Sequence, residues 1–310
     1  MADALTTTDV VDPAVNLVYQ RTLLRAARPE YVHAEFAQKF SIKRKSGNTM
    51  KFRRYNLYSA ATTPMVDGIT PNGHRQSKVD LHAQCSQFGD FATLTDVVSL
   101  IVEDKNIVIE LDLQNDQMRN TEDQLVRDVL AASASSTTCS NGSGTETLLN
   151  DTDIDAVRGT LRGANAKYMT SLVKAAQGQG TSPIKPAYWG IADTDLENDL
   201  EDVAGFKSTS NYPNQGTLHV AEWGATGNVR WITTTQGYVS SGTYSCPIIG
   251  QKAYGMIKID GGNAQAIVKG FGSGGTTDPL SQRATVGWKM WQAARILNDA
   301  FIHVLKCTDG

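Results

Sequence analysis

The stretch from Thr95 to Ala132 constrains the fold most, because its 38 consecutive residues include neither glycine nor proline. Nothing in it must therefore break a helix. Its apolar residues recur at helical spacing along a narrow stripe made by Ile107, Leu111, Met118, Leu125 and Val129. The stripe predicts a helix over residues 107–130, which would be roughly 35 Å long at about 1.5 Å per residue.

A helix of this length usually serves as a beam to which other layers attach, although a pair of ordinary core helices would fit the stripe equally well. Polar residues interrupt the pattern over 103–106, which is where we expect any kink. From the same stripe we expect Leu111, Met118 and Leu125 to pack in the core.

A basic segment precedes the predicted helix. No acidic residue occurs between Phe36 and Val66, while the basic residues there are Lys39, Lys43, Arg44, Lys45, Lys51, Arg53 and Arg54. Apolar and basic residues alternate around Met50 and Phe52, which is typical of a strand, and a second strand fits 77–88. Residues 40–90 therefore predict an extended hairpin with a long tip. Such a hairpin needs a surface to lie on, because an isolated hairpin is marginally stable in water.

The helical stretch carries the opposite charge, with ten acidic and three basic residues between Asp90 and Asp128. We therefore expect the basic hairpin of one subunit to lie over the acidic helix of its neighbour, near Glu110, Asp112 and Asp116. Two separately solvated faces are the alternative, since exposed charge pairs are individually weak.

The chain changes character after Ala132. A Ser/Thr/Gly-rich loop at 133–149 leads into an α+β lobe of about 150–275, with helices expected at 151–169 and 194–203 and strands at 187–192, 217–223, 227–235, 253–259 and 265–269. Long return strands follow at 281–307. In the first of these, Val286, Trp288 and Met290 share a face. We expect Trp288 and Met290 in the core, with Trp288 against the long helix.

Several functional classes are disfavoured. A net charge of -3 over 310 residues argues against a dedicated nucleic-acid binder. The four cysteines form no C-x-x-C pair and the five histidines are scattered, so we expect free thiols and no metal site. Gly270, Gly272 and Gly275 match a dinucleotide motif, but neither a helix nor the required acidic residue follows. We therefore expect no catalytic residue and no cofactor.

Targeting signals are missing as well. The first twelve residues are polar and acidic, unlike a signal peptide, and no apolar run approaches the roughly 20 residues of a membrane span. From these features we expect a protein that is made and used in a cytoplasm, without a membrane partner.

Three stretches carry a resemblance to a known family: residues 19–73, residues 87–96 (QFGDFATLTD), and residues 278–305 with their R-x-T-V-G-W-K-x-W core. In their order and spacing they resemble the major capsid proteins of tailed bacteriophages, in the branch related to coat proteins of podophages that infect enteric bacteria. The resemblance reaches both ends of the chain. Residues 135–250 match in layout more than in residues.

The resemblance implies the α+β major capsid fold shared by tailed phages and herpesviruses, the Johnson fold. Its parts would be an N-terminal arm (1–39), an extended β-hairpin loop (40–90), a peripheral domain with the spine helix (91–149), an axial domain (150–275) and peripheral return strands (276–310). In this layout the lattice-binding role carries over to the matching hairpin residues Lys43, Arg44, Lys45, Lys51, Arg53 and Arg54.

The same resemblance implies a structural protein without enzymatic activity. It would self-assemble as hexamers and pentamers into the icosahedral head around double-stranded DNA, reside in the virion and assemble in the bacterial cytoplasm. Implied partners are further copies of itself, a separate scaffolding protein, a portal, decoration proteins and non-specifically contacted DNA. Alternatives are a soluble cytoplasmic binding or oligomeric scaffold protein without catalytic activity, an enzyme using the glycine-rich loop, and a jelly-roll coat, whose nearly all-β fold the long helix does not fit.

Overall fold

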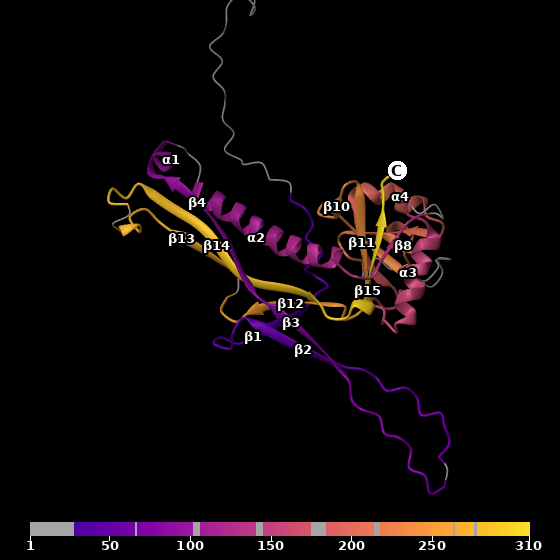
Figure 1. The fold of residues 1–310 in the computed structure, drawn as a ribbon. Coiled ribbons are helices and arrows are strands. Elements are labelled where there is room, and N and C mark those ends of the chain that lie inside the picture. Colours follow the sequence, from indigo (N-terminus) through magenta and orange to yellow (C-terminus); the bar gives the residue numbers. More distant parts are fainter. Residues whose placement is uncertain are drawn as a thin grey trace, which may run out of the picture.

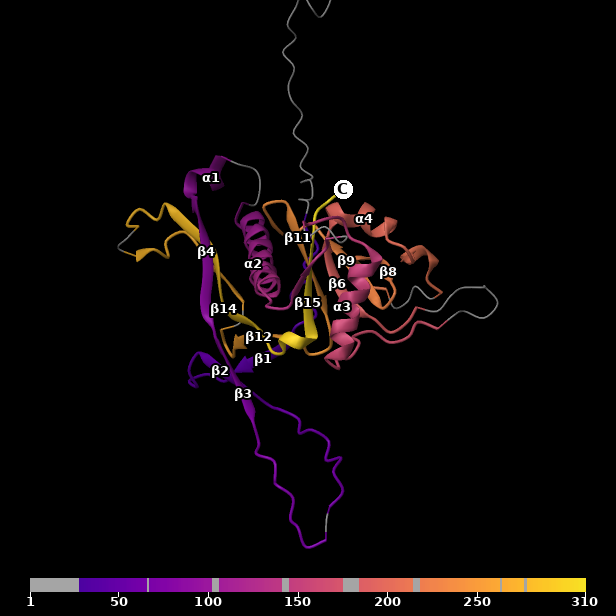
Figure 2. The same ribbon diagram turned by 45° about the vertical axis from the view of Figure 1, so that its right-hand side comes forward.

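The chain contains a helix-backed sheet, a second sheet within a helical lobe, and a long hairpin that projects from the body (Figures 1 and 2). The first 27 residues of the expected N-terminal arm (1–39) lie outside the described part. The computed structural model describes residues 28–65, 67–101, 106–140, 145–174, 184–213, 218–262, 264–275 and 278–310.

The first sheet is built on one long strand, β14 (Arg283–Ile296). β4 (Ser86–Thr95) pairs with it antiparallel, while β13 (Gln265–Lys269) and β12 (Tyr254–Ile259) follow one another along its other edge. β1 (Gln38–Ile42) extends this sheet by pairing with β12 in parallel. The two-residue alternation predicted for β14 is confirmed, because the inward-facing residues are buried: Val286, Trp288 and Met290.

Two helices, α1 (Asp96–Ile101) and α2 (Asn106–Ala131), follow β4. The expected kink lies almost wholly outside the described residues. With 26 residues, α2 is about 39 Å long, as predicted. It lies against the first sheet, where Trp288 Nε1 donates a hydrogen bond to Gln117 Oε1 at 3.0 Å. The tryptophan therefore packs against the long helix.

The prediction of which face of α2 is buried is wrong. The buried face is rotated around the helix axis by about one residue from the predicted one. Leu111, Met118 and Leu125 are half-buried. The buried residues of α2 are instead Gln114, Asp123, Val126 and Leu130. Two of these four are polar, and Asp123 is buried because it accepts hydrogen bonds from a distant segment of the chain. An apolar stripe cannot reveal a face that is partly buried by polar contacts.

The second sheet forms the lobe. Its strand order is β5 (Ser136–Thr138), β15 (Ile302–Cys307), β11 (Thr243–Ile249), β6 (Tyr188–Asp193), β9 (Val229–Thr234), β8 (Glu222–Thr226) and β7 (Phe206–Ser208), with β10 (Tyr238–Ser240) beside β11. The described helical elements of the lobe are α3 (Asp151–Gly163), η1 (Thr194–Leu196), α4 (Glu197–Asp202) and η2 (Thr209–Asn211), and η5 (Asp299–Phe301) precedes β15.

The core of the lobe lies between this sheet and the apolar faces of the helices. From α3, Ile154 and Leu161 pack into one cluster with Tyr188 and Trp231 of the central strands. All six residues of β6 are buried, as expected for a strand covered on both faces. The tight fit requires Gly190, because a β carbon there would lie 2.6 Å from the Trp231 ring.

The sheets do not follow the domain boundaries expected from the sequence. β12 and β13 fall within the expected axial range 150–275 but belong to the first sheet, whereas β15 falls within the expected return strands but belongs to the lobe. The expected hairpin of 40–90 is also too wide. It includes most of β1 and the first half of β4, and both strands are part of the first sheet. Local patterns predict strands well, but they carry no information on which distant strand each one joins.

Candidate assembly interface

The hairpin consists of β2 (Thr49–Tyr55) and β3 (Lys78–Gln84), which pair antiparallel and form a separate two-stranded sheet. Beyond the strands, the segment of residues 56–77, which we call the tip, extends far from both other sheets (Figures 1 and 2). The backbone N–H of Asn56 donates to the carbonyl of Ser77 at 3.0 Å where the tip begins.

The base of the hairpin is attached to the first sheet by one apolar face. Met50 and Phe52 pack on a cluster that contains Ile42 and Ile257, and the rings of Phe52 and Phe40 lie 5.0 Å apart. The alternation predicted from the sequence is therefore what attaches β2 to its own chain.

The opposite face of the hairpin carries its charges, and Asp80 of β3 lies at their centre. Its carboxylate is 2.8 Å from Arg53 Nε, 3.0 Å from Lys51 Nζ and 3.6 Å from Lys78 Nζ. The hydrogen bond from Arg53, supported by Lys51, holds the pKa of Asp80 well below its usual range. Two of the residues expected to contact a neighbour are therefore already paired within the hairpin.

Two more of the expected contact residues have partners in the same chain. Arg44 Nε donates to the carbonyl of Asp260 at 3.1 Å, and Arg54 donates to Asn298 Oδ1. Within the described residues, Lys43 and Lys45 are the two of the six whose side chains form no hydrogen bond or ion pair. They lie in the turn between β1 and β2 and are both exposed.

The tip, in contrast, exposes apolar side chains. Leu57 is 97% exposed, Met65 77% and Ile69 64%. Exposed apolar residues that gather on a thin projection mark an interaction site, because water solvates them unfavourably. The contact predicted from charge lies on the basic strands and does not include these residues, although the sequence from Asn56 to Thr70 has few charges and several apolar positions.

The acidic residues of α2 expected at the contact also have partners in their own chain. Arg28 forms ion pairs with Asp112 and Asp116, and the Tyr31 hydroxyl donates to Asp116 Oδ1 at 3.0 Å. Burial and this hydrogen bond raise the pKa of Tyr31 to about 12. Glu110 accepts from Gln114 Nε2 at 3.1 Å, within the same helix.

Most of these partners belong to residues 28–37, which we call the strap. His33 is buried, with Nδ1 2.7 Å from Asp123 Oδ2, and the backbone N–H of Ala34 donates to the same carboxylate at 3.1 Å. On the lobe side, Glu35 lies 2.9 Å from His219 Nε2. The strap therefore connects α2 to the lobe, a role that the sequence did not reveal.

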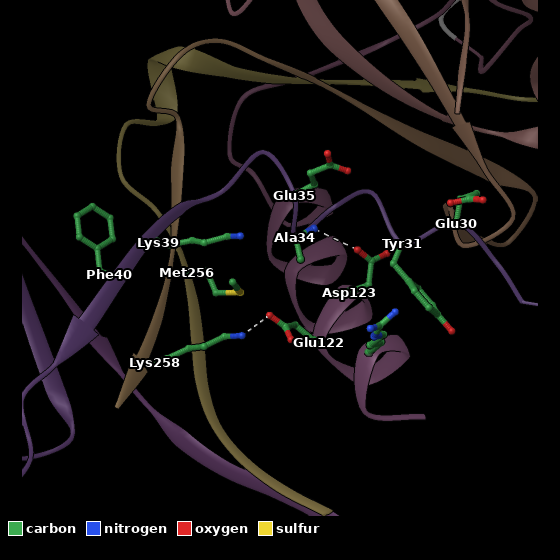
Figure 3. Close-up of a pocket in the computed structure, with 11 residues that line it drawn as sticks. Glu30, Tyr31, Ala34, Glu35, Lys39, Phe40, Glu122, Asp123, Met256 and Lys258 are labelled. Carbon is green, nitrogen blue, oxygen red and sulfur yellow. Dashed lines mark hydrogen bonds and ion pairs between the residues drawn. The ribbon is translucent and has the colours of Figure 1, made fainter. Parts of the chain in front are cut away.

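A groove lies where the strap, β1, β12 and α2 meet (Figure 3). It has a volume of about 480 Å³. Lys39, Arg119 and Lys258 contribute positive charge to its lining, and Met256 contributes an apolar patch.

No group of three or more His, Cys, Asp or Glu side chains in the described ranges is placed to hold a metal ion. After β13, the glycine-rich residues 271–274 form turns. All four cysteines are buried free thiols. In the part of the chain that the structure covers, no helix is both long enough and apolar enough to cross a membrane.

Comparisons with known proteins point to one fold. No protein-family model and no curated protein sequence matches the chain. Solved structures do match along nearly its whole length. The capsid of Helicobacter pylori bacteriophage KHP30 is 11% identical with a TM-score of 0.66, and covers 98% of each chain.

Two further solved structures agree with this match. The capsid of Ralstonia phage GP4 has 11% identity and a TM-score of 0.66 over 99% of each chain. The capsid of Cyanophage P-SCSP1u has 11% identity and a TM-score of 0.65, over 98% of this chain and 96% of its own. Similarity at such low identity concerns the fold, and it confirms the α+β tailed-phage capsid fold that the sequence resemblance implied.

Proposed function

We propose that this chain is the major capsid protein of a tailed bacteriophage, and that copies of it assemble into the icosahedral head that encloses double-stranded DNA. The full-length likeness to three phage capsids carries this proposal. Its place of action is then the virion, after assembly in the host cytoplasm.

The hairpin supplies a physical reason for assembly. Its tip exposes Leu57, Met65 and Ile69 and lies away from both other sheets of the described chain, so contact with a neighbouring copy would remove this apolar surface from water. A contact in which the tip of one copy meets a different surface of the next is heterologous. Such contacts close into rings when the rotation allows, which is the geometry of hexamers and pentamers.

Fewer charged residues are available for a contact between copies than the sequence predicted. Lys43 and Lys45 remain available to an acidic neighbour, whereas Lys51, Arg53, Asp112 and Asp116 already have partners in the same chain. We therefore assign the main contact to the apolar tip and a secondary, salt-sensitive contact to the two lysines. A scaffolding protein, a portal, decoration proteins and packaged DNA are the further partners we propose.

Electron microscopy of the purified full-length protein tests the function directly. We expect shells, tubes or rings, alone or after addition of a crowding agent. Dispersed monomers under all conditions, together with a monomeric elution volume in size-exclusion chromatography, would instead favour a soluble binding protein.

A further inference from the structure

The groove of Figure 3 has walls from three parts of the chain. β1 and β12 form one wall. In their parallel register Lys39 lies opposite Met256 and Ser41 opposite Lys258, so the two lysines and the methionine share a face. Figure 3 shows both lysine side chains extending from these strands toward α2. The strap and α2 complete the groove.

The carboxylates that line the groove are mostly engaged. Glu122 pairs with Lys258 at 2.7 Å, Asp123 is held by His33, and Glu35 by His219. Lys39 and Arg119 are exposed cations, and neither side chain has a hydrogen bond or ion pair within the described ranges. The groove therefore offers two cations whose side chains have no partner among the described residues, and they lie beside an apolar patch.

We propose that this groove is the docking site for the acidic N-terminal segment of the chain itself, residues 1–12. Carboxylates of the segment would pair with Lys39 and Arg119, while its apolar side chains would cover Met256. The proposal concerns a single chain and does not depend on shell formation.

Composition and length of the segment support this assignment. Residues 1–12 include Asp3, Asp9 and Asp12, and the first basic residue of the chain is Arg21. The described chain begins at Arg28, and the groove is lined by Glu30 and Tyr31 of the strap that follows directly. The sixteen residues from Asp12 to Arg28 can span up to about 50 Å when extended and about 24 Å as a helix. Because the groove begins only two residues after Arg28, at Glu30, a linker that folds back on itself within the extended reach returns the segment to the groove.

A nucleic-acid duplex is a poorer occupant. Four carboxylates line the groove, from Glu30, Glu35, Glu122 and Asp123, and they would repel a phosphate backbone. A peptide places single carboxylates between these acidic groups with less repulsion.

Carbodiimide crosslinking of the full-length protein tests the proposal, because it joins a lysine only to a carboxylate in contact with it. We expect mass spectrometry to find Lys39 joined to Asp3, Asp9 or Asp12. The Lys258–Glu122 pair, 2.7 Å apart, is a built-in positive control. The yield of the Lys39 products should fall as salt rises from about 0.01 to 1 M, since the screening length shrinks from about 30 to 3 Å.

Variants and isotope labels make the test decisive. Arg119→Gln should lower the Lys39 crosslink yield by up to about fivefold, the range expected for one exposed pair, while Lys43→Gln, outside the groove, should leave it unchanged. Lys39 joined only to Glu30 or Glu35, with the control pair present, overturns the proposal. Mixing ¹⁴N- and ¹⁵N-labelled protein identifies products between copies. If the Lys39 products are mainly mixed, the assignment to the same chain is wrong.

Discussion

Strands β6 and β2 differ in how far the rest of the chain buries them. Every residue of β6 is buried, between helices and neighbouring strands, whereas no residue of β2 is fully buried. Both strands are nonetheless read easily from local sequence. The difference shows that a strand pattern predicts conformation but does not show whether the chain itself supplies the surface that the strand needs. The lobe is stabilised by its own buried core, whereas the described residues of the chain provide no core that covers the hairpin tip.

The largest effect should come from the centre of the lobe. Trp231→Ala removes a fully buried indole and should lower the free energy of unfolding by about 3–5 kcal/mol. Urea denaturation followed by circular dichroism measures this. Val220→Ala, at a site in the same lobe that is 89% exposed, is the control. A loss below about 1 kcal/mol for Trp231→Ala would show that the lobe core repacks easily.

At the hairpin tip, the same measurement should show almost nothing. Replacing Leu57, Met65 and Ile69 together by serine removes exposed apolar groups, so each change should alter the free energy of unfolding by no more than about 0.5 kcal/mol. Assembly, followed by electron microscopy, should be lost. Normal shells from this triple variant would mean that the tip is not the main contact.

Charge-reversing substitutions can distinguish contacts between two copies of the chain from contacts within one copy. Arg53→Glu/Arg54→Glu should disturb the hairpin itself, because these side chains bind Asp80 and Asn298 of the same chain. Lys43→Glu/Lys45→Glu should leave the monomer folded and shift assembly to a different salt concentration, since surface attraction is screened over about 8–10 Å at physiological ionic strength. Light scattering across a salt series measures the assembly of both variants. Identical salt curves for wild type and the lysine variant would exclude the secondary contact.

The smallest effect concerns the pH response of the hairpin. The pKa of Asp80 is held below its usual range by Arg53 and then Lys51, so its ion pairs stabilise the folded hairpin above the ordinary aspartate value of about 3.9. This stabilisation declines as the pH falls below the ordinary value and is fully lost once the pH lies below the folded-state pKa. An NMR titration of the Asp80 carboxyl should therefore give a midpoint well below about 3.9, and Arg53→Gln should raise it. A wild-type midpoint at the ordinary value would show that the exposed pairs are solvent-separated.

Much of the fold could be predicted from the sequence where local chemistry decides it. The lack of glycine and proline predicted α2, the alternation of apolar residues predicted β14, and a short apolar run predicted β6. Sheet membership could not be predicted, because the pairing of β14 with β4 joins residues about 190 positions apart and leaves no local pattern.

The candidate site was harder to predict for a related reason. Charge patterns suggested complementary surfaces, but they could not show that Asp80, on the facing strand, already pairs with Lys51 and Arg53. Nor did any local signal indicate that His33 of the strap would reach Asp123 in the middle of α2. These contacts depend on the tertiary arrangement, and opposite charges in a sequence do not specify whether they meet within one copy or between two.

The length of β14 has a mechanical consequence. Its 14 residues extend over about 46 Å. Only residues 297–301 separate it from β15 in the lobe, so one nearly continuous stretch of backbone runs through both sheets. A pull along this stretch loads the ten β4–β14 residue pairs in shear, so that they share the force instead of opening one after another. β14 can therefore carry tension through the subunit, which suits the shell wall that we propose this chain forms.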